Sequence, residues 1–208
     1  MKKIILFLLA FCLIAPIANA QNKQLNKALK KEYKNKMKEI KDGKWEIFGS
    51  SRSAEVTLLS HFDKLESLGE DAHVVIGIAS KFKSKNIGKQ MATNNACISY
   101  AQEAGSSVKG RVVSDMGGDG IEADKEMDNF YAAYERLVER EIRGEMRESY
   151  SLIRNNGDGT FEMQTYFIIN EKAASQARIR AFESAAKESA AAQKYAEKVS
   201  EFVKEGFE

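Results

Sequence analysis

The chain has 208 residues, of which 32 are lysine or arginine and 30 are aspartate or glutamate. This near balance argues against nucleic acid as a partner, because neutralising a phosphate backbone requires an excess of basic side chains. The length fits one domain, or one domain with helical additions.

The first twenty residues have the features of a secretory signal peptide. Lys2 and Lys3 give a positive start, residues 4–17 form an apolar run, and Ala18-Asn19-Ala20 offers a small-x-small cleavage pattern. We therefore expect cleavage after Ala20 and a periplasmic or secreted chain. A retained membrane anchor is the alternative, but the apolar run is short for a span. No second run reaches membrane length, so no transmembrane segment is expected after processing.

The segment 21–44 is predicted to be a basic amphipathic helix, ended by Asp42 and Gly43. It carries nine lysines against three acidic residues. Within 22–41, apolar side chains recur every three or four residues, at Leu25, Ala28, Leu29, Tyr33, Met37 and Ile40. Such a helix suits a peripheral contact with anionic lipid or an acidic partner. Alternatively, it packs on its own domain.

A strand, a helix and a second strand follow. Residues 45–49 are strand-like, and helical spacing of leucines predicts a helix over 54–68, capped by Ser53 and stopped by Gly69. The β-branched run at 72–82 predicts a central strand.

Helical spacing returns at 86–105, and 106–115 is predicted to be a further strand because of its valines. Small residues on the helix would let it approach a sheet closely: Ala92, Ala96, Ser99 and Ala104. Cys97, the single cysteine of the processed chain, is interpreted as a small buried hydrophobe rather than a reactive thiol.

The glycine-rich stretch 115–126, DMGGDGIEADKE, differs from a calcium loop at one ligand position. Gly120 stands where the sharp turn is needed, but Gly117 has no side-chain oxygen for the third position. The ligands would be Asp115, Asp119 and Glu126. A strand leading into the loop also contradicts the helix–loop–helix context. We interpret the stretch as a strand-to-helix connection in which Asp119 or Asp124 interacts with the positive N-terminus of the next helix.

An aromatic-rich helix is predicted from Met127 to Val138, and alternation over 142–152 predicts a strand. The turn 155–159 joins it to a partner strand at 160–169, because Asn and Gly tolerate positive φ. One face of that partner strand carries Phe161, Met163, Thr165, Phe167 and Ile169.

The segment 171–208 is rich in alanine and predicts a long helix from Glu171 to about Phe202. It has a shallow stripe of four alanines, at positions 174, 177, 181 and 185. Such a helix packs closely on a sheet or another helix, and its end is a candidate partner contact.

No catalytic, cofactor-binding or metal-ligating constellation is recognised. His61 lies between Ser60 and Asp63, but neighbours at these spacings point to different faces of a helix. Two histidines and one cysteine lack zinc spacing, and phosphate-binding glycine motifs are absent. A pairing of Cys97 with His73 stays open.

Residues 72–170 resemble a known family. An alanine-spaced helix, then SSVKGRVVSD, a helix, and IRGEMRESYSLIRNNGDGTFEMQTYF form a pattern similar to an envelope domain. That domain is shared by the Lpp-type twenty-kilodalton envelope lipoproteins and the N-terminal domain of flagellar assembly protein T. The resemblance implies an α+β domain used for assembly or interaction, without catalytic residues. The chain lacks the family's lipidation cysteine.

Together these patterns predict an α+β domain over 45–170, with an antiparallel or mixed sheet of four to five strands. Helices would cover mainly one face, and long helices would stand at both ends. The expected function is that of an exported, non-enzymatic cell-envelope protein that binds an envelope protein partner through 22–41 or 171–206. The alternative is a periplasmic small-ligand or calcium-binding module that uses 115–126.

Overall fold

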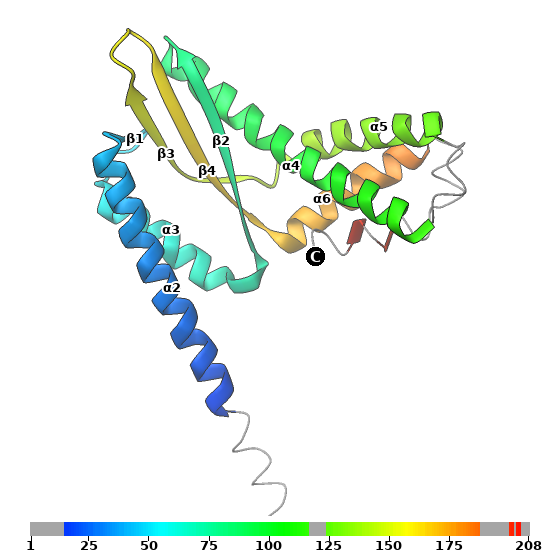
Figure 1. The fold of residues 1–208 in the computed structure, drawn as a ribbon, viewed down its shortest axis with the longest axis horizontal. Helices are drawn as coiled ribbons and strands as arrows, with labels where there is room; N and C mark the ends of the chain where they lie inside the picture. Colours follow the sequence, from blue (N-terminus) through cyan, green and yellow to red (C-terminus); the bar gives the residue numbers. More distant parts are fainter. Residues whose placement is uncertain (1–14, 117–123, 188–199, 202, 205–208) are drawn as a thin grey trace, which may run out of the picture. The chain divides into compact units, whose positions relative to one another are not determined.

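The computed structural model describes residues 15–116, 124–187, 200–201 and 203–204. It is an α+β protein with a four-stranded antiparallel sheet (Figure 1). The chain divides into two compact units, which are described in turn. Unit 1 comprises Met1–Glu46 and Ser51–Gly69, and unit 2 comprises Ile47–Ser50 and Glu70–Glu208.

Unit 1 is a pair of helices, α2 (Ala15–Asp42) and α3 (Ala54–Leu68). The predicted bounds of α3 are confirmed, because Ser53 Oγ accepts a hydrogen bond from Val56 N at 3.3 Å and Gly69 caps the other end with φ 57°. The predicted end of α2 is confirmed as well, where Gly43 N donates to Glu39 O at 2.8 Å. The helix already begins at Ala15, before the expected cleavage site.

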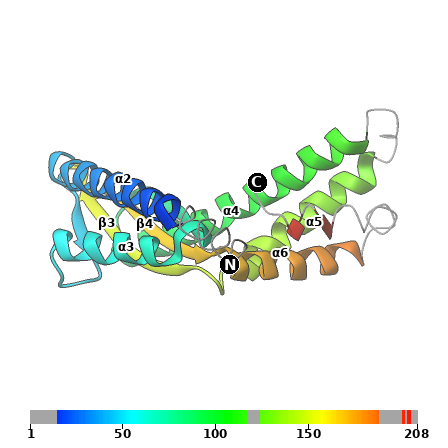
Figure 2. The ribbon, with the colours of Figure 1, turned by 90° about the horizontal axis from the view of Figure 1, so that it is seen from below.

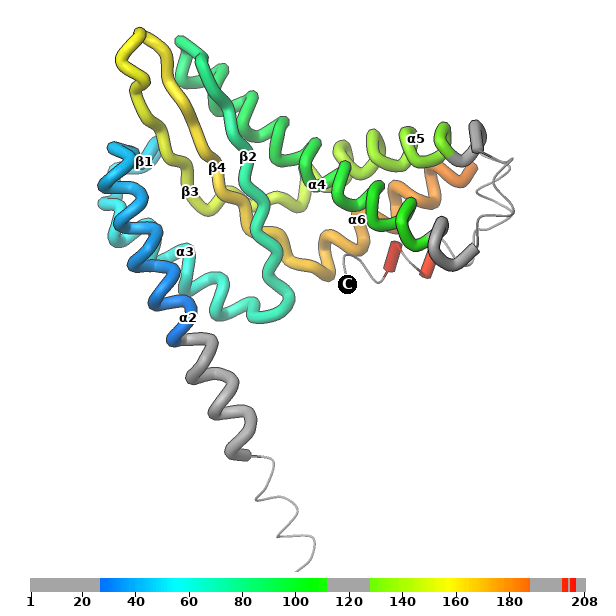
Figure 3. Tube along the Cα trace, viewed as in Figure 1, coloured from blue at the N-terminus to red at the C-terminus, as the bar shows by residue number. Residues whose placement is uncertain are grey.

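The sheet has the strand order β1-β3-β4-β2. It is formed by β1 (Glu46–Phe48), β2 (Ala72–Phe82), β3 (Arg147–Asn155) and β4 (Phe161–Asn170). The strands predicted at 45–49, 72–82 and 160–169 are confirmed. The prediction that the strand at 72–82 is central is wrong. β2 lies at one edge of the sheet, and β4 lies between β2 and β3 (Figure 3).

The β3–β4 hairpin forms as the turn chemistry predicts. Gly157 and Gly159 have φ of 83° and 81°, the left-handed region that glycine adopts without strain. Asn155 Oδ1 accepts from Gly157 N at 2.8 Å, and Asp158 Oδ1 accepts from Thr160 N at 2.9 Å. These side chains close the turn and thereby set the register of the two strands.

The helix α4 (Lys85–Met116) packs on β2 with its first half. A Cβ at Gly77 would lie only 1.8 Å from Ala92 O, so the helix rests directly on the strand backbone at this point. Ala92 and Ala96 are fully buried, as predicted, whereas Ser99 is exposed. The small residues therefore set the distance between helix and sheet.

The strand predicted at 106–115 is wrong, because α4 continues through it to Met116. Val108 is buried and continues the helical stripe of Ala101 and Ala104. The valines favoured a strand by local propensity, but packing of this stripe against other helices favours the helix, and tertiary contacts override propensity. The interpretation of residues 115–126 as a strand-to-helix connection is therefore wrong as well, because a helix leads into them.

The second half of α4 lies beside α5 (Asp124–Ile142), and α6 (Glu171–Ala186) packs along α5 (Figures 1 and 2). The predicted alternation from residue 142 is wrong at its start. Ile142 is fully buried on the stripe of Tyr134 and Val138, so α5 runs through it and β3 begins only at Arg147. The four predicted alanines of α6 are all buried in the shared core.

Parts of the predicted terminal segments lie outside the described residues, namely 1–14, 188–199, 202 and 205–208. The continuous helix expected from Glu171 to Phe202 is therefore described as α6 to Ala186, with short helical pieces at 200–201 and 203–204. In the part of the chain that the structure describes, no helix is long and apolar enough to cross a membrane.

Candidate interaction surfaces

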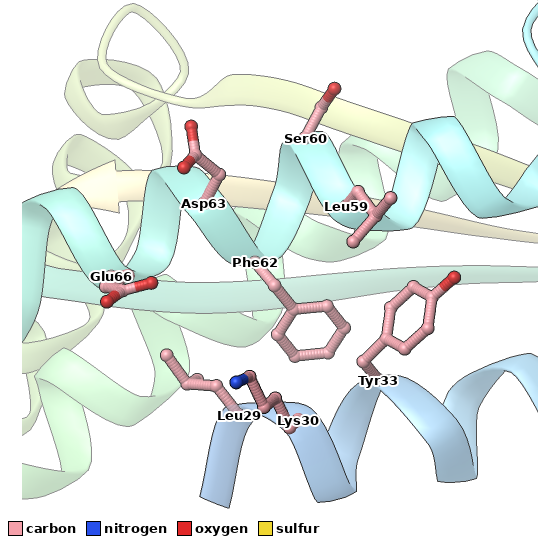
Figure 4. Close-up of a pocket in the computed structure, with 8 residues that line it drawn as sticks. All are labelled: Leu29, Lys30, Tyr33, Leu59, Ser60, Phe62, Asp63 and Glu66. Atoms are coloured by element: carbon pink, nitrogen blue, oxygen red, sulfur yellow. The ribbon is translucent and has the colours of Figure 1, made fainter. Parts of the chain in front are cut away.

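Unit 1 carries an open groove between its two helices. The groove has a volume of about 430 Å³. From α2 it is lined by Leu29, Lys30 and Tyr33, and from α3 by Leu59, Ser60, Phe62, Asp63 and Glu66 (Figure 4). The rings of Tyr33 and Phe62 meet edge to face across it, with centroids 6.2 Å apart. Its floor is thus apolar, while its margin carries charges of both signs.

Of the apolar stripe predicted on α2, Leu29 and Tyr33 line this groove, whereas Ala28 is exposed. Tyr33 and Met37 are half-buried, and Ile40 is fully buried. The alternative in which the basic helix packs on its own domain is therefore realised within unit 1. Lys36 of α2 is half-buried. Six described lysines of α2 are exposed, at positions 27, 30, 31, 34, 38 and 41.

Two large apolar side chains of α3 are exposed to solvent. Leu59 is 56% exposed and Val56 is 48% exposed on the same helix. Large apolar side chains that gather on an accessible surface mark interaction sites more often than single exposed ones do. Leu59 lines the groove, whereas Val56 does not.

His61 is on a different face of α3 from its polar neighbours. Ser60 and Asp63 line the open groove, whereas His61 is buried. Burial, together with Lys36 and Lys64, lowers the pKa of His61 to about 4. The imidazole is consequently neutral at pH 7, and these three side chains do not form a catalytic triad.

Unit 2 carries a second apolar surface along β2 and α4. Five large hydrophobic side chains on these two elements are exposed: Ile76, Ile78, Ile87, Met91 and Ile98. A hollow of about 310 Å³ lies between the strand and the helix, lined by Ile76, Ile78, Asn95, Ile98 and Ser99. Asn95 Nδ2 donates to Ile78 O at 2.7 Å across the hollow.

One described cluster places a lysine beside a serine, a combination that some hydrolases use for nucleophilic catalysis. Lys89 Nζ lies 2.5 Å from Ser151 Oγ and also forms an ion pair with Glu148. Ser151 Oγ lies 3.0 Å from Thr165 Oγ1. Ser151 and Thr165 are both fully buried. The geometry is that of a polar contact joining α4 to β3 and β4, and the serine is inaccessible to a substrate.

Among the side chains that the structure describes, the largest fully buried one is charged, Arg178 of α6. Its guanidinium donates to Glu171 Oε1 at 2.6 Å, to Tyr100 Oη at 2.5 Å and to Val203 O at 3.2 Å. Burial raises the pKa of Tyr100 to about 12, although Arg178 opposes the shift. This network joins α4, α6 and the piece at 203–204. A buried cation is compatible with folding because it is paired and hydrogen-bonded.

Cys97 and His73 do not form a described pair. Cys97 is fully buried and its Sγ lies 3.6 Å from Met146 Sδ, and burial raises the pKa of its thiol. The prediction of a small buried hydrophobe is therefore confirmed. His73 contacts the Tyr100 ring edge to face, with centroids 5.6 Å apart, and lies 4.0 Å from Glu103 Oε2.

The candidate calcium loop lies mainly outside the described residues, which resume at residue 124 after Met116. A helix precedes the undescribed residues and a helix follows them, so the objection based on a leading strand is removed. The helices run back along one another, however. Arg143 donates to Asn94 at 2.8 Å, and Lys109 pairs with Asp128 at 3.0 Å. Among the residues that the structure describes, no cluster of acidic, histidine or cysteine side chains is arranged to hold a metal ion.

The sequence pointed to the basic helix and the alanine-rich helix but missed the groove on α3 and the edge of β2. The spacing of leucines predicted the helix at 54–68 but not which of its side chains a neighbour covers, and β-branched residues placed the strand at 72–82 in the centre of the sheet. The apolar side chains Ile76 and Ile78 on alternate residues were the available signal. Only the strand order turns that signal into an exposed edge.

No protein-family model, curated protein or solved structure matches this chain. The resemblance of residues 72–170 to the envelope lipoprotein family therefore stays a prediction.

Proposed function

We propose that this chain is an exported cell-envelope protein that acts without catalysis, by binding a protein partner. In this proposal residues 1–20 are removed after Ala20, the helices of the folded domain cover mainly one face of the sheet, and the ends of the chain are long helices. The single observation that supports the binding role best is the open apolar groove between α2 and α3.

The groove fits a partner segment with an apolar face flanked by charges. Leu29, Leu59 and Phe62 supply an apolar floor, and removing this surface from water would favour association. Lysines on the α2 side and Asp63 and Glu66 on the α3 side give the two margins opposite charges. An amphipathic helix with acidic residues along one margin and basic residues along the other matches this arrangement.

The proposal that the protein acts without catalysis is supported by the positions of its candidate reactive side chains. Ser151, which contacts Lys89, is fully buried. In the accessible groove, Ser60 lies with Lys30, Asp63 and Glu66 around an apolar floor, and the buried His61 does not line it. A reacting group needs a base within hydrogen-bond reach and access for the substrate.

The proposal is tested by crosslinking in intact cells from a photoreactive residue at position 59, with mass spectrometry of the adduct. We expect one recurrent envelope protein, and we expect Leu59→Glu to abolish the adduct when the photoreactive residue stands at position 33 instead. Val56→Glu is the matched control, because Val56 has similar exposure on α3 but does not line the groove. If the crosslinked adduct still forms in the Leu59→Glu variant, the crosslinked partner does not bind through this groove.

The second candidate function is calcium or small-ligand binding at 115–126, which the helix on each side of the loop favours. Gly117 still lacks an oxygen for the third ligand position. Thermal unfolding with and without calcium decides it. A calcium-dependent rise in the unfolding temperature that disappears in Asp119→Ala would establish the alternative, and an unchanged wild-type temperature would reject calcium binding.

A further inference from the structure

The two edges of the sheet differ in length and protection. At one edge β1 has three residues, whereas at the other β2 has 11 residues. A long open edge presents backbone groups that pair with any suitable strand, and proteins usually blunt it with charges, proline or a bulge. From Ala72 to Ala79, β2 pairs with β4 in unbroken register. His73 is the only ionisable side chain of that stretch.

The outward backbone groups of β2 follow from the contact with Asn95. Since Ile78 O accepts the side-chain amide of Asn95 from α4, it points away from β4. Backbone groups of an antiparallel strand alternate between its two sides. Ile76 and Val74 are in phase with Ile78, so their N–H and C=O groups also point away from β4, on the side where Asn95 contacts Ile78 O. Among the residues that the structure describes, β4 is the one strand with which β2 is paired.

Apolar side chains surround this edge. Ile76 is 42% exposed and Ile78 is 49% exposed, and Ile98 of α4 lines the same hollow. Met91 and Ile87 extend the exposed stripe along the helix, at spacings of seven and eleven residues before Ile98. A strand added to β2 would therefore gain backbone hydrogen bonds and also cover apolar surface on the helix.

We propose that the occupant of this edge is the β2 strand of a second copy of the chain, paired antiparallel about a two-fold axis through Ile76. The two sheets would then form one eight-stranded antiparallel sheet, an isologous arrangement. The inference uses no residue of α2 or α3, so it stands independently of the proposed partner groove.

The sequence of β2 is complementary to itself about that axis. Ile76 meets its own copy, and Val74 meets Ile78, so apolar side chains oppose each other. Beyond them, Asp71, which precedes one strand and also pairs with Lys172 of its own chain at 3.1 Å, would approach Lys81 near the end of the other strand, which places opposite charges at both ends. If the occupant were an unrelated extended peptide, β2 would not need to be complementary to itself in its apolar side chains or in its end charges. Ile98 lies near the axis, since it shares the hollow with Ile76, so the two α4 helices would contribute apolar contacts across it.

The first test is the mass of the purified chain by light scattering after size exclusion, over a dilution series. We expect a dimer, and we expect Ile76→Lys to raise the dissociation constant by about tenfold or more, because two ammonium groups would oppose each other. Val56→Lys is the control, with a similarly exposed side chain on α3, and should leave the dimer intact. A monomeric wild-type chain, or a dimer unaffected by Ile76→Lys, overturns the proposal and leaves a segment of another protein as the occupant.

A second test reads the register and holds even if the lysine variant fails to fold. Oxidation of Ile76→Cys should give a disulfide-linked dimer, whereas Val74→Cys alone should not, since its own copy lies about 14 Å away along the strand. A mixture of Val74→Cys and Ile78→Cys should crosslink. The parent chain is the background control, because its Cys97 is buried. Self-crosslinking of Val74→Cys equal to that of Ile76→Cys would overturn the axis through Ile76.

Discussion

The two halves of α4 are packed in opposite ways. On the sheet, the helix rests on Gly77 through Ala92 and Ala96, where side chains are small or missing. Beyond the sheet, it packs through Tyr100, which lies next to Arg178 and Tyr134, and through the smaller side chains of Ala101, Ala104 and Val108. The first contact tolerates no added atom. The second depends on a satisfied buried charge.

The largest expected effect is at the contact with the sheet. Gly77→Ala places a Cβ 1.8 Å from Ala92 O and 2.7 Å from its carbonyl carbon, so the helix must move away from β2. We expect the free energy of unfolding to fall by about 3 kcal/mol or more, measured by urea denaturation.

Gly110→Ala is the matched control for that variant. Gly110 lies on the same helix, and a Cβ there meets nothing within 4 Å. This change should stabilise the protein by about 1 kcal/mol, because alanine favours a helix over glycine. If both variants changed stability alike, close packing at Gly77 would not be what distinguishes the two halves.

The contact of α4 with the other helices should be the one that is sensitive to alkaline pH. Burial raises the folded pKa of Tyr100 from 10 to about 12, and burial raises that of Tyr134 as well. The stabilisation is complete below pH 10, where both states are protonated, and is lost as pH rises through 12. For Tyr100 it amounts to about 3 kcal/mol.

The check is the urea midpoint between pH 9 and pH 12. Tyr100→Phe should flatten its decline, even though the variant also loses the hydrogen bond from Arg178. An unchanged slope in the variant would mean that Tyr100 ionises equally in the folded and unfolded chain.

A smaller loss is expected when the buried arginine loses its carboxylate. Glu171→Gln removes the counterion that lies 2.6 Å from the guanidinium of Arg178, although Glu171 itself is about one-third exposed. We expect a loss of about 2 kcal/mol in the free energy of unfolding. The control is Glu183→Gln, at an exposed position of the same helix. Equal stability of the two variants would show that Tyr100 and Val203 O suffice for Arg178.

The smallest effect has the opposite sign. Among the described residues, Tyr134 Oη is buried and has no hydrogen-bond partner. Tyr134→Phe removes an unsatisfied hydroxyl while keeping the ring, so the unfolding free energy should rise by about 1 kcal/mol. Tyr131→Phe, in the same helix, is the comparison and should change stability by less than about 0.5 kcal/mol. A destabilised Tyr134→Phe would show that the hydroxyl is satisfied in solution.

The candidate surfaces were less predictable than the elements that carry them. The basic helix and the alanine stripe of α6 follow from periodicity alone. The groove at Leu59 does not, because periodicity shows that a leucine lies on an apolar stripe and not how much of that stripe a neighbour covers. Arg178 was equally hidden, since its burial depends on Tyr100, 78 residues away in the chain.

Local chemistry by itself determined the helix at 54–68, the strand at 72–82 and the turn at 155–159. In each, the deciding interactions join residues only a few positions apart: the Ser53 cap, alternation of side chains, and glycines at positive φ. Tertiary structure decided that 106–115 is helical and that β2 is an edge strand. Both outcomes depend on contacts between segments far apart in the chain, whose burial outweighs local propensity and leaves no mark within a short window of sequence.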